Sequence, residues 1–287
     1  MPKSFLEYLI MKYLYSISLS LFNVFSFAQV PWPQNVSKYS CIDSTTIEMR
    51  YEFKYKNHHT QKEYNEDVRV VQIGKTVVKE YSEALFFYDS LATEYSKLGK
   101  DVPSIQTAPY PCESFIQKRE KIIDVKYRLL MNIGTLCYQT KQPRFAWNYS
   151  SDDGINILGY NCNKATTIFA GREYVAWYTL EVPIHYGPFK FWGLSGLIVR
   201  IEEKNGMYVW NLLRLSSKSK GIYVYKYDNE QECSEEMANR TITRMMSNPL
   251  AFEMSNTDIP IYSYKNGKLI PIPMEGKEEA YEPIELQ

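Results

Sequence analysis

The sequence predicts a β-rich α+β fold with a mainly antiparallel sheet. Thr45–Lys56 alternates apolar and polar residues, which is typical of a long strand with one face in water. Further runs of apolar and aromatic residues are separated by short turns, and the Asn205–Gly206 pair between two of them favours a tight hairpin. Helical periodicity is confined to a few segments, so we expect two or three helices packed on the sheet.

The first half of the chain combines strands with two of these helices. Strands are expected at Thr45–Lys56, Val68–Ile73 and Thr76–Tyr81. Ser82 is a suitable N-cap for a helix whose apolar residues recur at helical spacing until Gly99 ends it. Glu113–Asn132 has a weaker helical spacing of apolar residues, and we interpret it as the second helix.

The second half is expected to return to strands and to end in a helix and a tail. The predicted strands are Ile155–Tyr160, Lys164–Phe169, Tyr174–Thr179, Leu197–Glu202, Met207–Leu213 and Ile222–Tyr227. We place a turn at Asn161–Asn163 and a third helix at Glu230–Met246 that stops near Pro249. Residues 251–287 are rich in proline and are expected to form an extended tail, while residues 29–250 show no internal repeat or linker and are predicted to form a single domain.

Gly187–Ile201 is the most distinctive stretch of the chain, because glycines and a proline stand among large apolar residues. A phosphate-binding loop would be followed by a helix, whereas Leu197–Ile201 is strand-like. We therefore interpret the stretch as a tight backbone corner that feeds a buried strand. The predicted structural motif comprises Gly187, Pro188, Gly193, Leu194, Ser195, Gly196, Leu197 and Ile198.

The first 28 residues are typical of a signal peptide. Lys3 and Lys12 supply positive charge, Leu14–Phe27 is an apolar core, and Ser26–Ala28 fits a cleavage site. A start at Met11 would give a more compact signal than a start at Met1, and both stay open. No later stretch of the sequence is long and apolar enough for a transmembrane helix. We therefore expect an exported protein, located in the periplasm or secreted.

Composition limits the function classes. The 33 basic residues balance 33 acidic residues, which gives no argument for nucleic-acid binding. Export permits disulfides, and five cysteines leave at least one without a partner in the chain. The sequence has no Cys-x-x-Cys pair and no cysteine close to a histidine, so we predict no metal site and no other cofactor.

Several segments around the glycine-rich corner carry the features of a known family. Ile157–Ala165 is followed by Gly171–Thr179, Val182–Ile184 and Phe191–Ile198. Together these segments resemble the GLPGLI family of exported proteins, which is typical of Bacteroidetes-type bacteria. The name-giving motif corresponds to Gly193–Ile198, with serine at its third position where the family has proline, a difference that removes a fixed φ from the corner.

The resemblance implies a fold more than an activity. The family is mostly of unknown function and is not established as an enzyme. A similar module forms the bowl-like N-terminal domain of some bacterial glycan-releasing amidases. The resemblance therefore implies that the antiparallel sheet is curved, as a bowl or half-barrel, and that the helices pack against it.

Four residues near the corner are candidate ligand contacts, namely Arg172, Trp177, Tyr178 and His185. Arg172 could hold an anionic group and the two rings could stack on a ligand, although these residue types suit core packing equally. His185 is a polar group suited to a pocket or to a structural role. The sequence contains no nucleophile elbow, so we assign no catalytic residue.

These features favour an exported binding or accessory protein that is not an enzyme. Its partner would be an apolar or peptide-like ligand, or an outer-membrane protein. One alternative is a hydrolase that uses His185 with a carboxylate or with Cys162, which requires these groups within hydrogen-bond distance. A second alternative is a purely structural envelope protein, which predicts no pocket.

Overall fold

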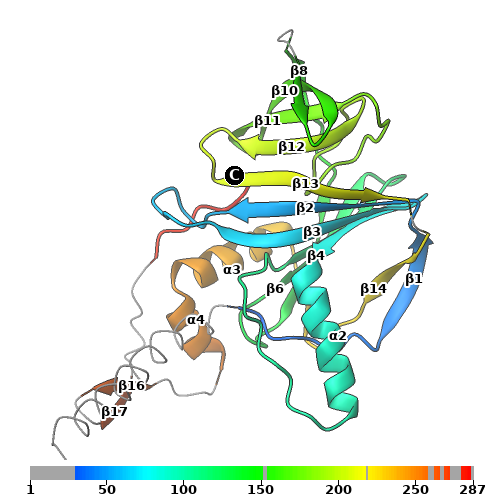
Figure 1. The fold of residues 1–287 in the computed structure, drawn as a ribbon. Coiled ribbons are helices and arrows are strands. Elements are labelled where there is room, and N and C mark those ends of the chain that lie inside the picture. The colour runs from blue at the N-terminus through cyan, green and yellow to red at the C-terminus, as the bar shows by residue number, and fades with distance from the viewer. Residues whose placement is uncertain are drawn as a thin grey trace, which may run out of the picture.

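One large, curved sheet organises the computed structural model of the protein (Figure 1). The structure describes residues 30–150, 154–217, 219–257, 262–265, 268–271 and 279–285, so the predicted signal peptide lies outside the described residues. Within these ranges 13 strands form the sheet, in the order β15-β7-β6-β5-β4-β3-β2-β13-β12-β11-β10-β8, and β9 pairs with β10. All pairs of described strands are antiparallel except β15–β7, which confirms the predicted fold class.

The strands of the large sheet are β2 (Ile47–Tyr55), β3 (Asn65–Ile73), β4 (Val77–Ser82), β5 (Cys112–Gln117), β6 (Ile122–Arg128), β7 (Thr135–Lys141), β8 (Asn148–Tyr149), β9 (Ile155–Ile157), β10 (Tyr160–Phe169), β11 (Arg172–Thr179), β12 (Leu197–Glu203), β13 (Tyr208–Ser216) and β15 (Glu230–Glu232). Two smaller sheets pair β1 (Tyr39–Ser44) with β14 (Gly221–Tyr225) and β16 (Tyr262–Lys265) with β17 (Lys268–Pro271). The described helices are α2 (Glu83–Lys97), α3 (Glu235–Ser247) and α4 (Pro249–Asn256).

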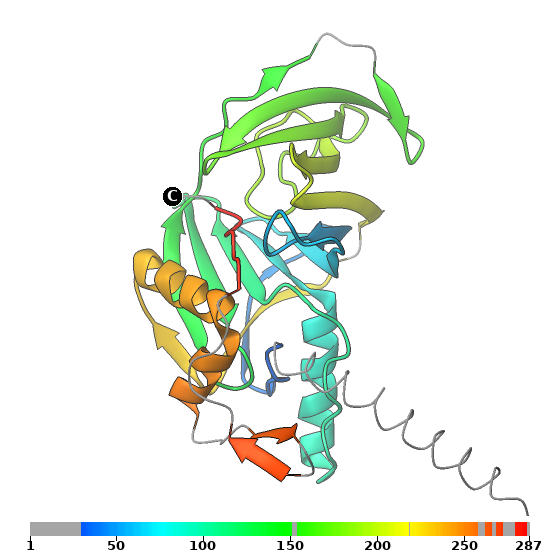
Figure 2. The ribbon, with the colours of Figure 1, turned by 90° about the vertical axis from the view of Figure 1, so that its left-hand side faces the viewer.

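The two faces of the sheet carry different elements. Tyr127 of β6 packs with α3 in an apolar cluster, and we call the face that it lies on the inner face. The next residue, Arg128, points to the opposite, outer face. There it forms a bidentate ion pair with Asp89 of α2. The C-terminal segment, Tyr281–Glu285, lies on the inner side, between α3 and the strands β2 and β3 (Figure 2).

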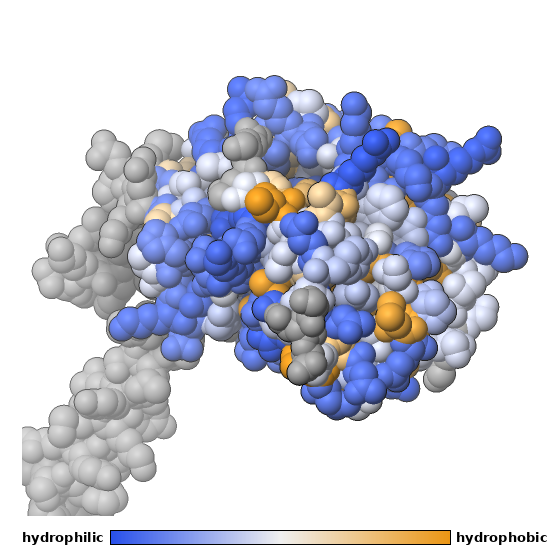
Figure 3. All heavy atoms as spheres, turned by 90° about the horizontal axis from the view of Figure 1, so that it is seen from above, coloured by the Kyte–Doolittle hydropathy of each residue, from blue (hydrophilic) through white to orange (hydrophobic). Residues whose placement is uncertain are grey.

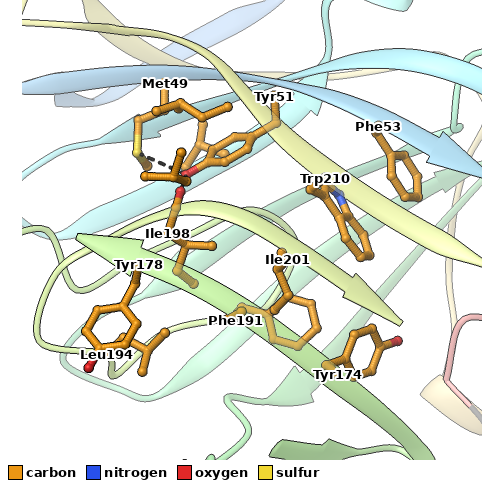
Figure 4. Packing of buried hydrophobic residues seen from close by; sticks show 14 of the residues in the cluster. Met49, Tyr51, Phe53, Tyr174, Tyr178, Phe191, Leu194, Ile198, Ile201 and Trp210 are labelled. Atoms are coloured by element: carbon orange, nitrogen blue, oxygen red, sulfur yellow. Dashed lines mark hydrogen bonds between the residues drawn. The ribbon is translucent and has the colours of Figure 1, made fainter. Parts of the chain in front are cut away.

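The main core lies on the inner face of β2 and its neighbours (Figure 4). The alternation in β2 buries Met49, Tyr51 and Phe53, as the sequence predicts. Phe53 stacks on Trp210 of β13, with ring centroids 4.5 Å apart. The Tyr51 hydroxyl donates a hydrogen bond to the Ile198 carbonyl at 2.8 Å, which ties β2 to the start of β12.

The predicted helix at Glu113–Asn132 is wrong. The segment forms the β5–β6 hairpin, in which Ile116 lies opposite Ile123 and Cys112 opposite Tyr127. Apolar residues that matched a helical spacing therefore face one another across two strands. The turn between them has no glycine, proline or asparagine, and Lys121 takes a positive φ of 56° in its place.

Two other boundaries differ from the prediction. The turn before β10 is at Leu158–Gly159, which both have positive φ, so the predicted turn at Asn161–Asn163 is part of the strand. Pro249 does not end the helical region but occupies the first turn of α4, where its missing N–H costs nothing. The predicted extended tail is therefore helical at its beginning.

The surface at the β8–β10 end of the sheet is largely hydrophilic, with scattered apolar residues (Figure 3). Ile168 of β10 is the most exposed of these, at 76%. No helix in the described part of the chain is both long and apolar enough to cross a membrane.

Candidate binding cavity

A cavity of about 710 Å³ lies on the inner face, between β3–β7, α3 and the C-terminal segment. Its volume is in the range of sites that hold small molecules or short peptides. The exposed wall is mostly apolar, and its aromatic residues are Tyr110, Tyr127, Tyr138, Phe189 and Tyr281. A few ionic and polar side chains stand among them at fixed positions.

The floor of the cavity is a row of side chains that the strand register brings together. Glu80 on β4 lies opposite Ser114 on β5, which lies opposite Val125 on β6. Val125 in turn lies opposite Tyr138 on β7. Residues directly opposite each other in antiparallel strands share a face, so four strands contribute one side chain each. Sequence reasoning missed this row because it placed a helix over β5 and β6.

Glu80 belongs to a buried ionic network centred on Arg69 of β3. The Arg69 guanidinium donates to Glu80 at 3.1 Å and to Asp67 at 3.2 Å. It also donates to the backbone carbonyls of Tyr110 and Cys112. Burial raises the pKa of both carboxyls, although the guanidinium opposes this shift. Since most Arg69 donors are used internally, we assign the network to holding the cavity wall.

The glycine-rich corner folds back into the inner face immediately before β12. Gly193 has a φ of +93°, which favours glycine. A Cβ on Gly196 would lie only 1.9 Å from the Thr179 carbonyl oxygen, so this residue needs glycine because of a close backbone approach. The corner places Phe191 and Leu194 in the main core, where both are buried.

The same corner brings Phe189 and Lys190 to the cavity wall. Phe189 has a φ of 56°, and its backbone N–H lies near enough to the Glu80 carboxylate to oppose the rise in the pKa of that group. Lys190 is 5% exposed, and its ammonium lies 2.6 Å from a carboxylate oxygen of Glu285. The stretch that the sequence predicts as a structural corner thus also supplies an aromatic ring and a buried cation to the cavity.

Exposed residues of α3 form the opposite rim. Arg240, Thr243 and Arg244 line the cavity and are exposed to solvent, whereas Ile242 beside them is buried. Neither arginine forms an ion pair with any residue in the described ranges. The rim therefore carries two positive charges that no carboxylate of the described chain neutralises.

The structure does not bring the four predicted ligand contacts together. Arg172 and Tyr178 lie at opposite ends of β11, and both are buried. Arg172 donates to the Pro283 carbonyl at 2.8 Å, and Tyr178 packs against the ring of Tyr149. Trp177 points to the other face, where the Arg200 guanidinium covers its ring.

His185 and Cys162 each bond to the backbone rather than to each other. The His185 side chain is exposed, and its Nδ1 lies 2.9 Å from the Leu194 carbonyl oxygen. The Cys162 thiol contacts the Tyr160 carbonyl. No carboxylate hydrogen-bonds to His185 within the described residues, so no specific contact favours the hydrolase alternative.

Comparisons with known proteins give limited matches. A protein-family model described as a protein of unknown function (Porph_ging) matches residues 170–200, which include β11 and the glycine-rich corner. Structures of PNGF-II in the P21 and C2 space groups are similar, each with a TM-score of 0.43 and 15% sequence identity. The match covers 78% of this chain and 36% of the PNGF-II chain, so it spans about a third of the length of that protein. No curated protein matches the sequence.

Proposed function

We propose that this protein is an exported binding or accessory protein of the GLPGLI type, which holds an apolar or peptide-like ligand in the inner cavity. The observation that carries the proposal is the 710 Å³ cavity itself, with its apolar wall and fixed polar groups. A purely structural envelope protein predicts no pocket, and the cavity therefore supports the binding function over that alternative.

The location of the cavity also supports binding. Its wall combines side chains from strands of the sheet, from the glycine-rich corner and from α3, and the ionic network of Arg69 fixes its base. Rigid elements of this kind hold a site open without a ligand. Export through the segment 1–28, to the periplasm or outside the cell, is part of the same proposal.

Native mass spectrometry of the protein purified from its own cell envelope tests this function. We expect a discrete ligand mass that is released on unfolding. Val125→Phe places a ring over the cavity floor and should abolish the ligand signal, because Val125 lies at the centre of the floor row. Gln139→Phe is the matched control, since Gln139 is exposed and follows Tyr138 on the other face of β7.

The two variants separate a cavity ligand from a surface contaminant. A ligand that is retained by Gln139→Phe and lost from Val125→Phe supports the proposal. A wild-type protein without any ligand, or a ligand that Val125→Phe retains while still folded, contradicts it.

A further inference from the structure

The C-terminal segment, Tyr281–Glu285, is bound in the protein as a peptide ligand would be. With the described part of the chain it makes one backbone–backbone hydrogen bond, from the Glu282 N–H to the Asn57 carbonyl at 2.7 Å. Each of its other polar contacts involves a side chain: the Tyr208 hydroxyl donates to the Glu282 carbonyl, Arg172 donates to the Pro283 carbonyl, and the His59 backbone N–H donates to the Glu282 carboxylate at 3.1 Å. A segment held in this way can detach without breaking a strand ladder.

The same segment divides one space into two. The cavity of about 710 Å³ lies on one side of Tyr281 and Ile284, and a second cavity of about 330 Å³ lies on the other. Tyr110 and Tyr127 also line both cavities. If the segment left, the two spaces would join into one groove with a continuous aromatic wall. An extended peptide fits a groove of this shape better than a compact molecule does.

Charge defines which peptide the groove prefers. Lys190 is buried, and Glu285 is its ion-pair partner among the described residues. Removal of Glu285 would leave an unpaired buried cation, which is unfavourable unless another anion replaces it. Arg240 and Arg244 add positive charge at the rim, while Glu80 on the floor is already paired with Arg69.

The segment also leaves polar groups near it unpaired. The Nε of Arg172 and the hydroxyl of Tyr174 are buried and have no hydrogen-bond partner among the described residues. A bound chain with one more acceptor beside the position of Pro283 would satisfy Arg172 more completely.

We infer that the ligand of the inner cavity is an extended acidic peptide, with an aliphatic residue in the place of Ile284 and a carboxylate that pairs with Lys190 in the place of Glu285. The C-terminal segment is the tethered counterpart of this ligand and competes with it. This inference rests on the proposed binding function and names the ligand class of the same cavity.

Fluorescence polarisation with a synthetic peptide tests the inference. The probe is the labelled, C-terminally amidated peptide Glu-Ala-Tyr-Glu-Pro-Ile-Glu, which is the sequence of residues 279–285. The full-length chain should bind it weakly, because the tethered copy has a high effective concentration. Ile284→Ala removes most of the buried anchor of the segment. It should bind the probe at least about tenfold more tightly than the wild type.

Charge controls test the role of the buried cation. The affinity gained by Ile284→Ala should be lost when Lys190→Met is added. It should also be lost when the probe carries glutamine in place of its glutamates. Glu285→Gln is a second variant that weakens the tethered copy without altering the core, and it should also bind the probe more tightly than the wild type.

Each outcome has a defined meaning. A folded Ile284→Ala or Glu285→Gln variant that binds the probe no better than the wild type overturns the inference, as does binding that is insensitive to Lys190→Met. If native mass spectrometry instead finds a ligand that is not a peptide, lost from Val125→Phe, the binding function stands and the peptide inference fails.

Discussion

Gly196→Ala tests whether the glycine-rich corner packs as the structure describes. A Cβ at this position would lie 1.9 Å from the Thr179 carbonyl oxygen and 2.7 Å from its carbonyl carbon. Ordinary contact distances are about 3.5 Å, so the corner or the end of β11 must move by more than about an ångström. Both partners are backbone atoms next to the β11–β12 pairing of Thr179 with Leu197, and a rotamer change cannot relieve the contact.

The expected cost follows from this geometry. Overpacking of a core costs about 1–3 kcal/mol, and a contact between backbone atoms belongs at the upper end of that range. For a domain of this size, about 3 kcal/mol lowers the melting temperature by about 6–12 °C. Differential scanning calorimetry of the purified protein measures this change.

Two other glycines act as controls because they separate steric contact from backbone conformation. Gly99 has a φ of +61° with nothing within 4 Å of an added Cβ, and Gly193 has a φ of +93° with only the Trp147 indole nitrogen at 3.8 Å. Alanine at either position should cost about 1–2 kcal/mol, the usual penalty of a left-handed conformation. A melting temperature of Gly196→Ala equal to that of Gly99→Ala would refute the close backbone approach.

Three further predictions concern charges and thiols. Arg128→Met should lower the free energy of unfolding by about 3–5 kcal/mol because it leaves Asp89 buried without its ion-pair partner. In urea unfolding, the double variant with Asp89→Leu should recover much of this lost stability. A double variant no more stable than the single one would contradict the prediction. The Glu282 pKa is lowered by its hydrogen bond from His59, so this carboxylate stabilises the fold above about pH 4.3 and ceases to do so as the pH falls through its folded-state pKa. Glu282→Gln should therefore lower the melting temperature more at pH 6 than at pH 3, and an equal effect at both values would disprove the assignment. All five cysteines are free thiols; Cys41 is exposed, whereas burial raises the pKa of Cys112 to about 12. Labelling of the folded protein with a maleimide, followed by peptide mapping, should therefore modify Cys41 first. Faster labelling of Cys112 would contradict the structure.

Local sequence patterns were enough to predict several secondary-structure elements. The alternation in Thr45–Lys56 predicts β2 because its period of two can bury only one face. Ser82 predicts the start of α2, and in the structure its side chain accepts a hydrogen bond from the Leu85 N–H. The Asn205–Gly206 pair predicts the β12–β13 hairpin, where Gly206 takes a φ of +74°. Each of these signals lies within a few residues of the feature that it predicts.

Other features depended on distant partners. The β5–β6 hairpin was not predicted because its apolar residues can satisfy either a helical face or two facing strands, and only pairing with β4 and β7 decides between them. The buried position of Arg69 is equally hidden in the sequence. A charged residue between apolar neighbours suggests exposure unless Asp67 and Glu80 are known to surround it.

The sequence by itself determined that this chain forms a β-rich fold with few helices, and that a glycine-rich corner precedes a buried strand. Hydrophobic periodicity and the steric freedom of glycine act over short distances along the chain, so the structures that they favour can be predicted from the sequence. The tertiary structure alone decided that the corner places Lys190 in the cavity wall. It also decided that Glu285, 95 residues later in the chain, forms an ion pair with Lys190 at that position. Burial and ion pairing depend on which distant segments share one face of the sheet, and that arrangement is fixed by the packing of the whole chain.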